Sequence, residues 1–98
     1  MQGKLFVSDY TFEMVNNEMV LYTKCNNKIL VLNKTAVFIL RELEKLIEKD
    51  DEIIVEDIAK NLIYEYSICE SQQTDITKDV QSIIDLFIET SLLKNSLT

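Results

Sequence analysis

The sequence of 98 residues contains no histidine, no tryptophan and no proline, and its single glycine is Gly3. Without histidine, a catalytic triad, most zinc sites and a proton shuttle near neutral pH are disfavoured. A glycine-rich phosphate loop needs several glycines and is excluded. The residue types therefore indicate no catalytic site, no metal site and no cofactor, and they favour a binding protein over an enzyme.

Long apolar runs are also absent. No stretch approaches the ~18 apolar residues of a membrane span, and the first residues lack the apolar segment of a signal peptide. The only cysteines are Cys25 and Cys69, which we interpret as small, half-buried residues with free thiols in a reducing compartment. These features predict a cytoplasmic protein without membrane contact.

Acidic residues outnumber basic ones by 17 to 10, which gives a net charge of −7. This charge opposes a nucleic-acid backbone at long range and keeps a protein soluble. The acidic run Asp50-Asp51-Glu52 lacks the ligand spacing of a calcium loop and is interpreted as solvated loop charge. Hydrophobic residues make up 47% of the chain, enough for the modest core of one small domain spanning residues 1–98.

Three strands are predicted in the first third of the chain. Tyr10 to Met14 alternates apolar and polar residues, the pattern of a half-buried strand, and Glu18 to Lys24 and Lys28 to Leu32 follow it. The pairs Asn16-Asn17 and Asn26-Asn27 separate the strands, and asparagine tolerates the positive φ of tight hairpins. The pattern predicts an antiparallel meander.

Two-residue turns at both hairpins would place Met14 opposite Met19, and Leu21 opposite both Phe12 and Leu32. One face would then carry Phe12, Met14, Met19, Leu21, Leu30 and Leu32, with Thr23 as its polar member. The other face would carry Thr11, Glu13, Lys24 and an apolar cluster of Val20, Tyr22, Ile29 and Val31. The N–H groups of Ile29 and Val31 should point away from the second strand, toward a free edge.

Two helices follow the third strand. Asn33 is a good N-cap for the first, which shows apolar residues at helical spacing as far as Ile47. The second is predicted from about Val55 to Tyr66, and the polar segment Ser67 to Thr74 is predicted to be a loop. Met1 to Asp9 shows no clear pattern and is left as an N-terminal arm.

A third helix is predicted from Ile76 to about Ser91, with Asp75 as its cap. Its apolar residues cover an arc of roughly 200° at ~100° per residue, wider than the ~100° stripe needed to face one core. The helix is therefore either buried on two sides or has one flank, with Ile83 and Leu86, that lines an apolar groove.

Strands followed by helices indicate an α+β fold with a winged-helix-like layout. One alternative function is therefore a DNA-binding transcriptional regulator, but a recognition helix needs basic residues. The third helix has Lys78 near its start and carries Asp79, Asp85 and Glu89. The charges therefore disfavour nucleic acid. A homodimer through the free strand edge is a further alternative.

Several short motifs resemble those of a known family. Leu32-Asn33-x-Thr35-Ala36 ends the third strand, a Val-x-x-Ile-Ala segment begins at Val55, Asp79-Val80 opens a helix and Leu92-Leu93 closes it. The pattern is similar to PqqD, the peptide chaperone of pyrroloquinoline quinone biosynthesis, and to related recognition domains for ribosomally synthesised and modified peptides. Two positions often occupied by glycine in that family hold Asp51-Glu52 and Ser91 here.

This resemblance implies a small fold that binds the leader of a precursor peptide as an added strand. The leader would lie between the third strand and the third helix and be presented to a modifying enzyme, such as a radical SAM enzyme, a cyclase or a leader peptidase. The peptide-binding residues implied are Ile29, Leu30 and Val31 on the strand and Asp79, Ile83 and Leu86 on the helix. The product, the precursor and the partner enzyme stay open.

Overall fold

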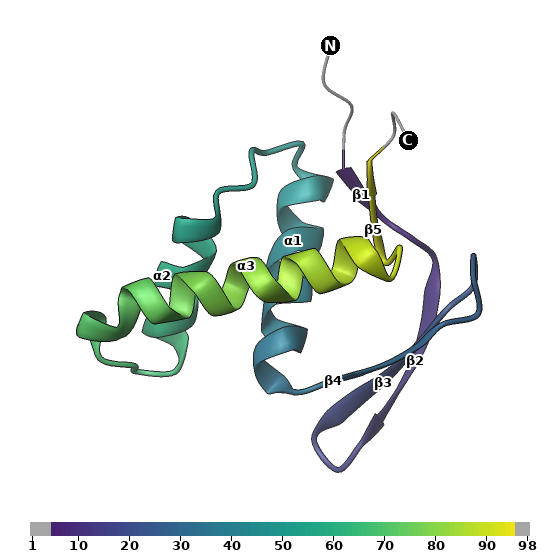
Figure 1. Cartoon of the computed structure of the whole chain (residues 1–98), viewed down its shortest axis with the longest axis horizontal. Coiled ribbons are helices and arrows are strands. Elements are labelled where there is room, and N and C mark those ends of the chain that lie inside the picture. The colour runs from purple at the N-terminus through teal and green to yellow at the C-terminus, as the bar shows by residue number, and fades with distance from the viewer. Residues whose placement is uncertain (1–4, 96–98) are drawn as a thin grey trace.

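The computed structural model describes residues 5–95 and confirms an α+β fold of the predicted kind (Figure 1). The elements are β1 (Leu5–Val7), β2 (Tyr10–Val15), β3 (Glu18–Thr23), β4 (Ile29–Leu32), α1 (Lys34–Glu48), α2 (Val55–Glu65), the 3-10 turn η1 (Glu70–Gln72), α3 (Gln73–Glu89) and β5 (Leu93–Asn95). The antiparallel meander has the order β2-β3-β4, and β1 pairs with β5 in a second, two-stranded sheet. Within residues 5–95, no helix is long and apolar enough to cross a membrane.

The first hairpin has the predicted register. Met14 lies opposite Met19 and Phe12 lies opposite Leu21. Asn16 and Asn17 form the turn with φ values of 51° and 68°, as a two-residue turn that matches strand twist requires. The asparagine pair thus determines this register locally.

The second hairpin corrects the prediction by two residues. Leu21 pairs with Leu30, not with Leu32, and the strands end where the Thr23 N–H donates to the Lys28 carbonyl at 2.9 Å. The buried Thr23 hydroxyl also hydrogen-bonds to Asn26 and accepts from the Lys28 N–H. These bonds to Thr23 favour a longer loop over a two-residue turn. A shift of two residues leaves each side chain on its predicted face.

One core joins the meander and the helices. Its fully buried members from the sheet are Met19, Leu21 and Leu32. The members from α1 are Ala36, Ile39, Leu40 and Leu43, those from α2 are Ile58, Ala59 and Leu62, and those from the C-terminal part are Val80, Ile84, Phe87, Leu92 and Leu93. Phe12 and Met14 share the core-side face but are about half exposed, because β2 is an outer strand and the helices cover mainly β3 and β4.

Each helix is followed, two residues after its last residue, by a residue with left-handed backbone. Asp50, Ser67 and Ser91 have φ values of 57°, 52° and 63°. After α1, the Asp51 N–H donates to the Leu46 carbonyl at 2.8 Å, the long bond of a Schellman motif. Glycine is the usual residue at such a position, but Asp50, Ser67 and Ser91 take it here. The helix-ending geometry is therefore kept without glycine.

The N-terminal arm was predicted wrongly, because β1 forms a strand. Its partner β5 lies at the other end of the described chain, and Leu5 pairs with Asn95. Just after β1, the buried Ser8 donates its hydroxyl to the Ser91 carbonyl at 2.6 Å and its N–H to the Leu92 carbonyl at 2.8 Å. Three-residue strands carry too little pattern to be recognised alone. Residues 1–4 of the predicted arm lie outside the described residues.

Two smaller predictions are also corrected. Asp75 is not the cap of α3, which begins earlier, at Gln73; Asp75 lies in the first turn, where its charge still favours the helix dipole. The predicted loop is partly taken up by η1 and that first turn. Cys25 and Cys69 are free, as expected, but exposed rather than half-buried.

A hydrogen bond from the Tyr10 hydroxyl to Glu44 Oε2, at 3.0 Å, ties β2 to α1. Burial, followed by this bond and the charge of Glu44, raises the pKa of Tyr10 to about 12. Because the folded pKa lies above the unfolded value of about 10, the protonated tyrosine contributes stability below pH ~10, and the contribution is lost as pH rises through about 12.

We therefore expect one tyrosine to ionise near pH 12 when tyrosinate absorbance is followed in the folded protein. Tyr10→Phe should remove this phase. Tyr64→Phe is the control, because Tyr64 is 88% exposed and lies on α2. If the phase persists in Tyr10→Phe, the bond to Glu44 does not form in solution.

Candidate functional site

β4 is an outer strand of the meander, paired on one side only. Its N–H groups alternate in direction, starting from the bonded pair of Thr23 and Lys28. Leu30 and Leu32 therefore point their N–H groups toward β3, and Ile29 and Val31 point theirs toward the free edge. This is the predicted direction, because the two-residue shift in register preserves the alternation.

The outer face of the meander carries an apolar cluster at this edge. Val20 lies opposite Val31, and Tyr22 lies opposite Ile29. Ile29 and Val31 are 65% and 60% exposed. The four residues predicted to cluster are therefore direct cross-strand neighbours, and we call them the outer patch. An exposed apolar edge of this kind is a ready template for pairing with another strand.

The remaining predicted residues lie on the other side of the edge. Leu30 is half-buried on the core side of β4. On α3, Ile83 is half-buried against the core, Asp79 is exposed and Leu86 is 42% exposed. At ~100° per residue, Asp79, Ile83 and Leu86 share one flank of the helix. α3 is thus not fully buried on two sides, which removes one of the two sequence interpretations.

The loop between β3 and β4 brings these two elements together at one end. Asn26 Nδ2 donates to the Thr90 carbonyl at 3.1 Å, and Cys25 Sγ lies 4.0 Å from the Ser91 carbonyl. The start of β4 is thereby held against the C-terminal end of α3, and from there β4 runs toward the start of α1 (Figure 1). β4 and α3 are thus connected at one end through this loop, and each carries exposed apolar residues.

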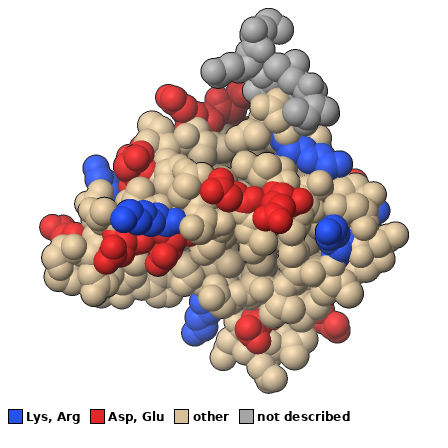
Figure 2. All heavy atoms as spheres, in the orientation of Figure 1, with Lys and Arg blue, Asp and Glu red and all other residues tan. Residues whose placement is uncertain are grey.

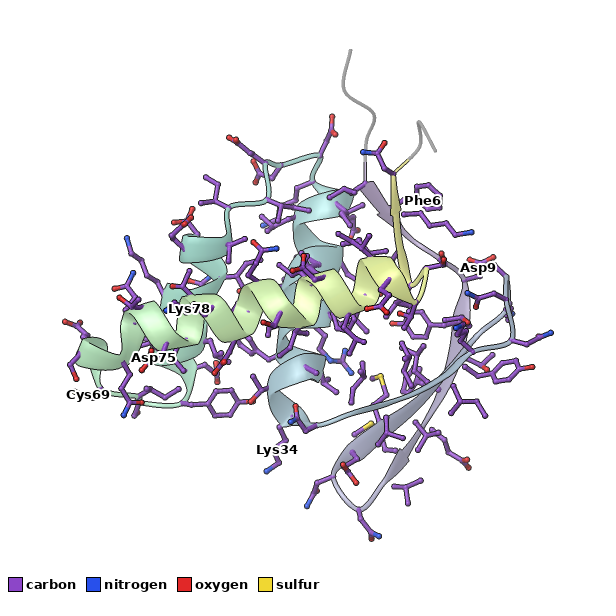
Figure 3. The ribbon with its side chains drawn as sticks, viewed as in Figure 1. Phe6, Asp9, Lys34, Cys69, Asp75 and Lys78 are labelled. Atoms are coloured by element: carbon purple, nitrogen blue, oxygen red, sulfur yellow. The ribbon has the colours of Figure 1, made fainter. Side chains whose placement is uncertain are left out.

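The exposed charge on α3 is mainly negative. Figure 2 shows acidic side chains along α3, where Asp79, Asp85 and Glu89 are exposed. No group of three metal-binding side chains occurs among residues 5–95. A hydrogen bond with the Ser71 hydroxyl lowers the pKa of Cys69, but Cys69 lies at the far end of α3 from β1 (Figure 3). The arrangement provides backbone donors, apolar surface and acceptors, which suits the binding of an extended peptide.

These elements define a class of α+β domain in which a three-stranded antiparallel meander precedes three helices in a winged-helix-like arrangement. Two solved structures share the fold. Lasso peptide synthetase B1 complexed with the leader peptide has a TM-score of 0.68 and 20% identity, and the match covers 93% of this chain and 98% of that chain. TbiB1 in complex with the TbiA(beta) leader peptide has a TM-score of 0.64 and 19% identity, with 90% and 93% covered. No protein-family model and no curated protein matches the sequence.

The exposure of Leu86 leads to a stability prediction. Leu86→Glu should remain folded and change the free energy of unfolding by less than about 1 kcal/mol, because the side chain reaches solvent. Phe87→Ala, at the neighbouring fully buried position, should cost about 3–5 kcal/mol. Urea denaturation followed by circular dichroism measures both. Unfolding of Leu86→Glu would mean that this flank of α3 is core.

Proposed function

We propose that this protein binds the leader segment of a ribosomally synthesised precursor peptide as a strand added to the free edge of β4. The observation that carries the proposal is the pair of outward N–H groups of Ile29 and Val31 at an exposed apolar edge. Strand addition uses such main-chain donors for affinity and side-chain pockets for specificity. The shared fold of two proteins solved with leader peptides supports this assignment.

The six predicted residues receive distinct roles in this proposal. Ile29 and Val31 donate backbone hydrogen bonds to the peptide, and their side chains contact the peptide residues that point to the outer face. Peptide residues of the opposite parity point to the helix side, where they contact Leu30, Ile83 and Leu86. Asp79 accepts a hydrogen bond from a polar peptide residue or forms an ion pair with a basic one.

The protein would have no chemistry of its own and would present the bound peptide to a modifying enzyme. A radical SAM enzyme, a cyclase and a leader peptidase are the candidate classes of partner. The lack of histidine in the whole chain supports a role in which catalysis belongs to this second protein.

Calorimetry with leader peptides from short reading frames neighbouring the gene tests the proposal. We expect micromolar affinity, about −8 kcal/mol, with amide shifts concentrated in β4. Val31→Pro removes one outward donor and should weaken binding by about 1 kcal/mol or more. The fold should survive, because proline is tolerated where the N–H faces away from the partner strand.

Phe12→Pro is the matched control for the other edge of the meander. In the β2-β3 register the Phe12 N–H also points outward, so this variant changes the β2 edge alone. Wild-type affinity in Phe12→Pro together with weakened binding in Val31→Pro would support β4. The reverse pattern would assign the peptide to β2, and unchanged binding in both variants would exclude strand addition.

A DNA-binding regulator is the alternative that the winged-helix-like layout suggests. The net charge of −7 and the exposed acidic residues on α3 predict no binding to duplex DNA at physiological salt. An electrophoretic mobility shift assay with mixed duplex sequences should therefore show free DNA throughout the titration. Sequence-specific retention at sub-micromolar protein concentrations would favour the regulator.

A further inference from the structure

A second concave site lies between the tip of the first hairpin, the start of α1 and the end of α2. It has a volume of about 220 Å³. Its lining residues are Met14, Asn17, Lys34, Val37, Phe38, Arg41 and Tyr66. We call it the α1 pocket. None of the six residues assigned to leader binding lines it, so the leader proposal leaves this site unexplained.

One face of α1 lines the α1 pocket. Lys34, Val37, Phe38 and Arg41 follow the spacing of a single helix face, and this face is distinct from the buried stripe of α1 that includes Ile39 and Leu43. Val37 and Phe38 are half-buried. The Phe38 ring meets the Tyr66 ring edge to face, with centroids 5.9 Å apart. The pocket is therefore lined by two aromatic rings in contact with each other and by two cations.

The charge of the α1 pocket is opposite to that of the protein. Arg41 is the only arginine in a chain of net charge −7, and no carboxylate lines the pocket. Among residues 5–95, neither Lys34 nor Arg41 makes an ion pair. Glu44, one turn further along α1, instead accepts the hydrogen bond from Tyr10. Two unpaired cations beside exposed apolar surface suit a ligand that brings both carboxylates and an apolar side chain.

We propose that the α1 pocket docks an acidic and apolar segment of a partner protein. A leucine or phenylalanine of that segment packs on Val37 and Phe38, and its flanking carboxylates pair with Lys34 and Arg41. Met14 extends the apolar surface from the hairpin, where it is 53% exposed.

This site and the leader-binding edge lie at opposite edges of the meander, because Met14 belongs to β2 and the leader-binding edge is β4. Met14 lies on the face of Leu21, as does Leu30 of the leader-binding edge, but β3 separates their two strands. A partner at the α1 pocket would therefore leave β4 free. A second copy of this chain is disfavoured as the occupant, because two copies of net charge −7 repel each other. The proposal is independent of leader binding.

Three acetylated hexapeptides test it against the isotope-labelled full chain by NMR titration: Glu-Asp-Leu-Phe-Asp-Glu, the basic Lys-Lys-Leu-Phe-Lys-Lys and the apolar-depleted Glu-Asp-Ser-Ser-Asp-Glu. The first should shift the amides of Val37, Phe38, Arg41 and Tyr66, with a Kd about tenfold lower than either control peptide. Arg41→Glu should raise the Kd of the first peptide by about tenfold or more. Lys34→Glu should do the same, and its new carboxylate at the start of α1 favours the helix.

Lys45→Glu is the matched control, because this substitution reverses one charge on the same helix. Lys45 is exposed and does not line the α1 pocket. Its Kd should stay within about twofold of wild type if the effect is local. Equal binding of the basic peptide, absence of shifts at the pocket, or wild-type affinity in both charge reversals would overturn the proposal. Concentration-dependent shifts at the pocket without peptide would instead assign it to a second copy of the chain.

Discussion

The junction between β4 and α1 is the constraint on which the rest of the structure depends. Asn33 Oδ1 accepts the Ala36 N–H at 2.9 Å, and the Asn33 carbonyl accepts the Val37 N–H at 2.9 Å. Leu32 before the cap and Ala36 after it are both buried, and a strand that continued past Asn33 would lose the cap bonds and the burial of Ala36. The helix therefore leaves the sheet here, and among residues 5–95 β4 stays an outer strand of the meander.

The position of α3, the second element of the candidate site, is set by the two ends of the described chain. Leu92 and Leu93 are buried directly after α3, and β1 holds this segment through β5 and through Ser8. Asn26 adds a bond from the meander to the last turn of α3. The flank of α3 that carries Leu86 is therefore fixed relative to β4 by contacts between residues far apart in the sequence.

Two kinds of surface result from this packing. The outer patch offers main-chain donors and β-branched side chains, which suits an extended peptide whose recognition rests on its backbone. The α1 pocket offers aromatic rings and unpaired cations, which suits a side chain with carboxylate neighbours. Met14 belongs to β2 and Val31 to β4, the two outer strands of the meander, so the two surfaces lie at opposite edges of one sheet.

The sequence by itself determined the meander, the faces of its side chains and the cap of α1, because alternation, asparagine turns and capping act between near neighbours. Asn16 and Asn17 sufficed for the first register, and Asn33 for the helix start. Only the tertiary structure decided the second register, which depends on the buried Thr23, and the strand β1, whose partner lies at the far end of the chain. It also decided that Leu86 stays exposed and that Lys34 and Arg41 lie beside Tyr66, because such outcomes depend on how helices distant in sequence pack.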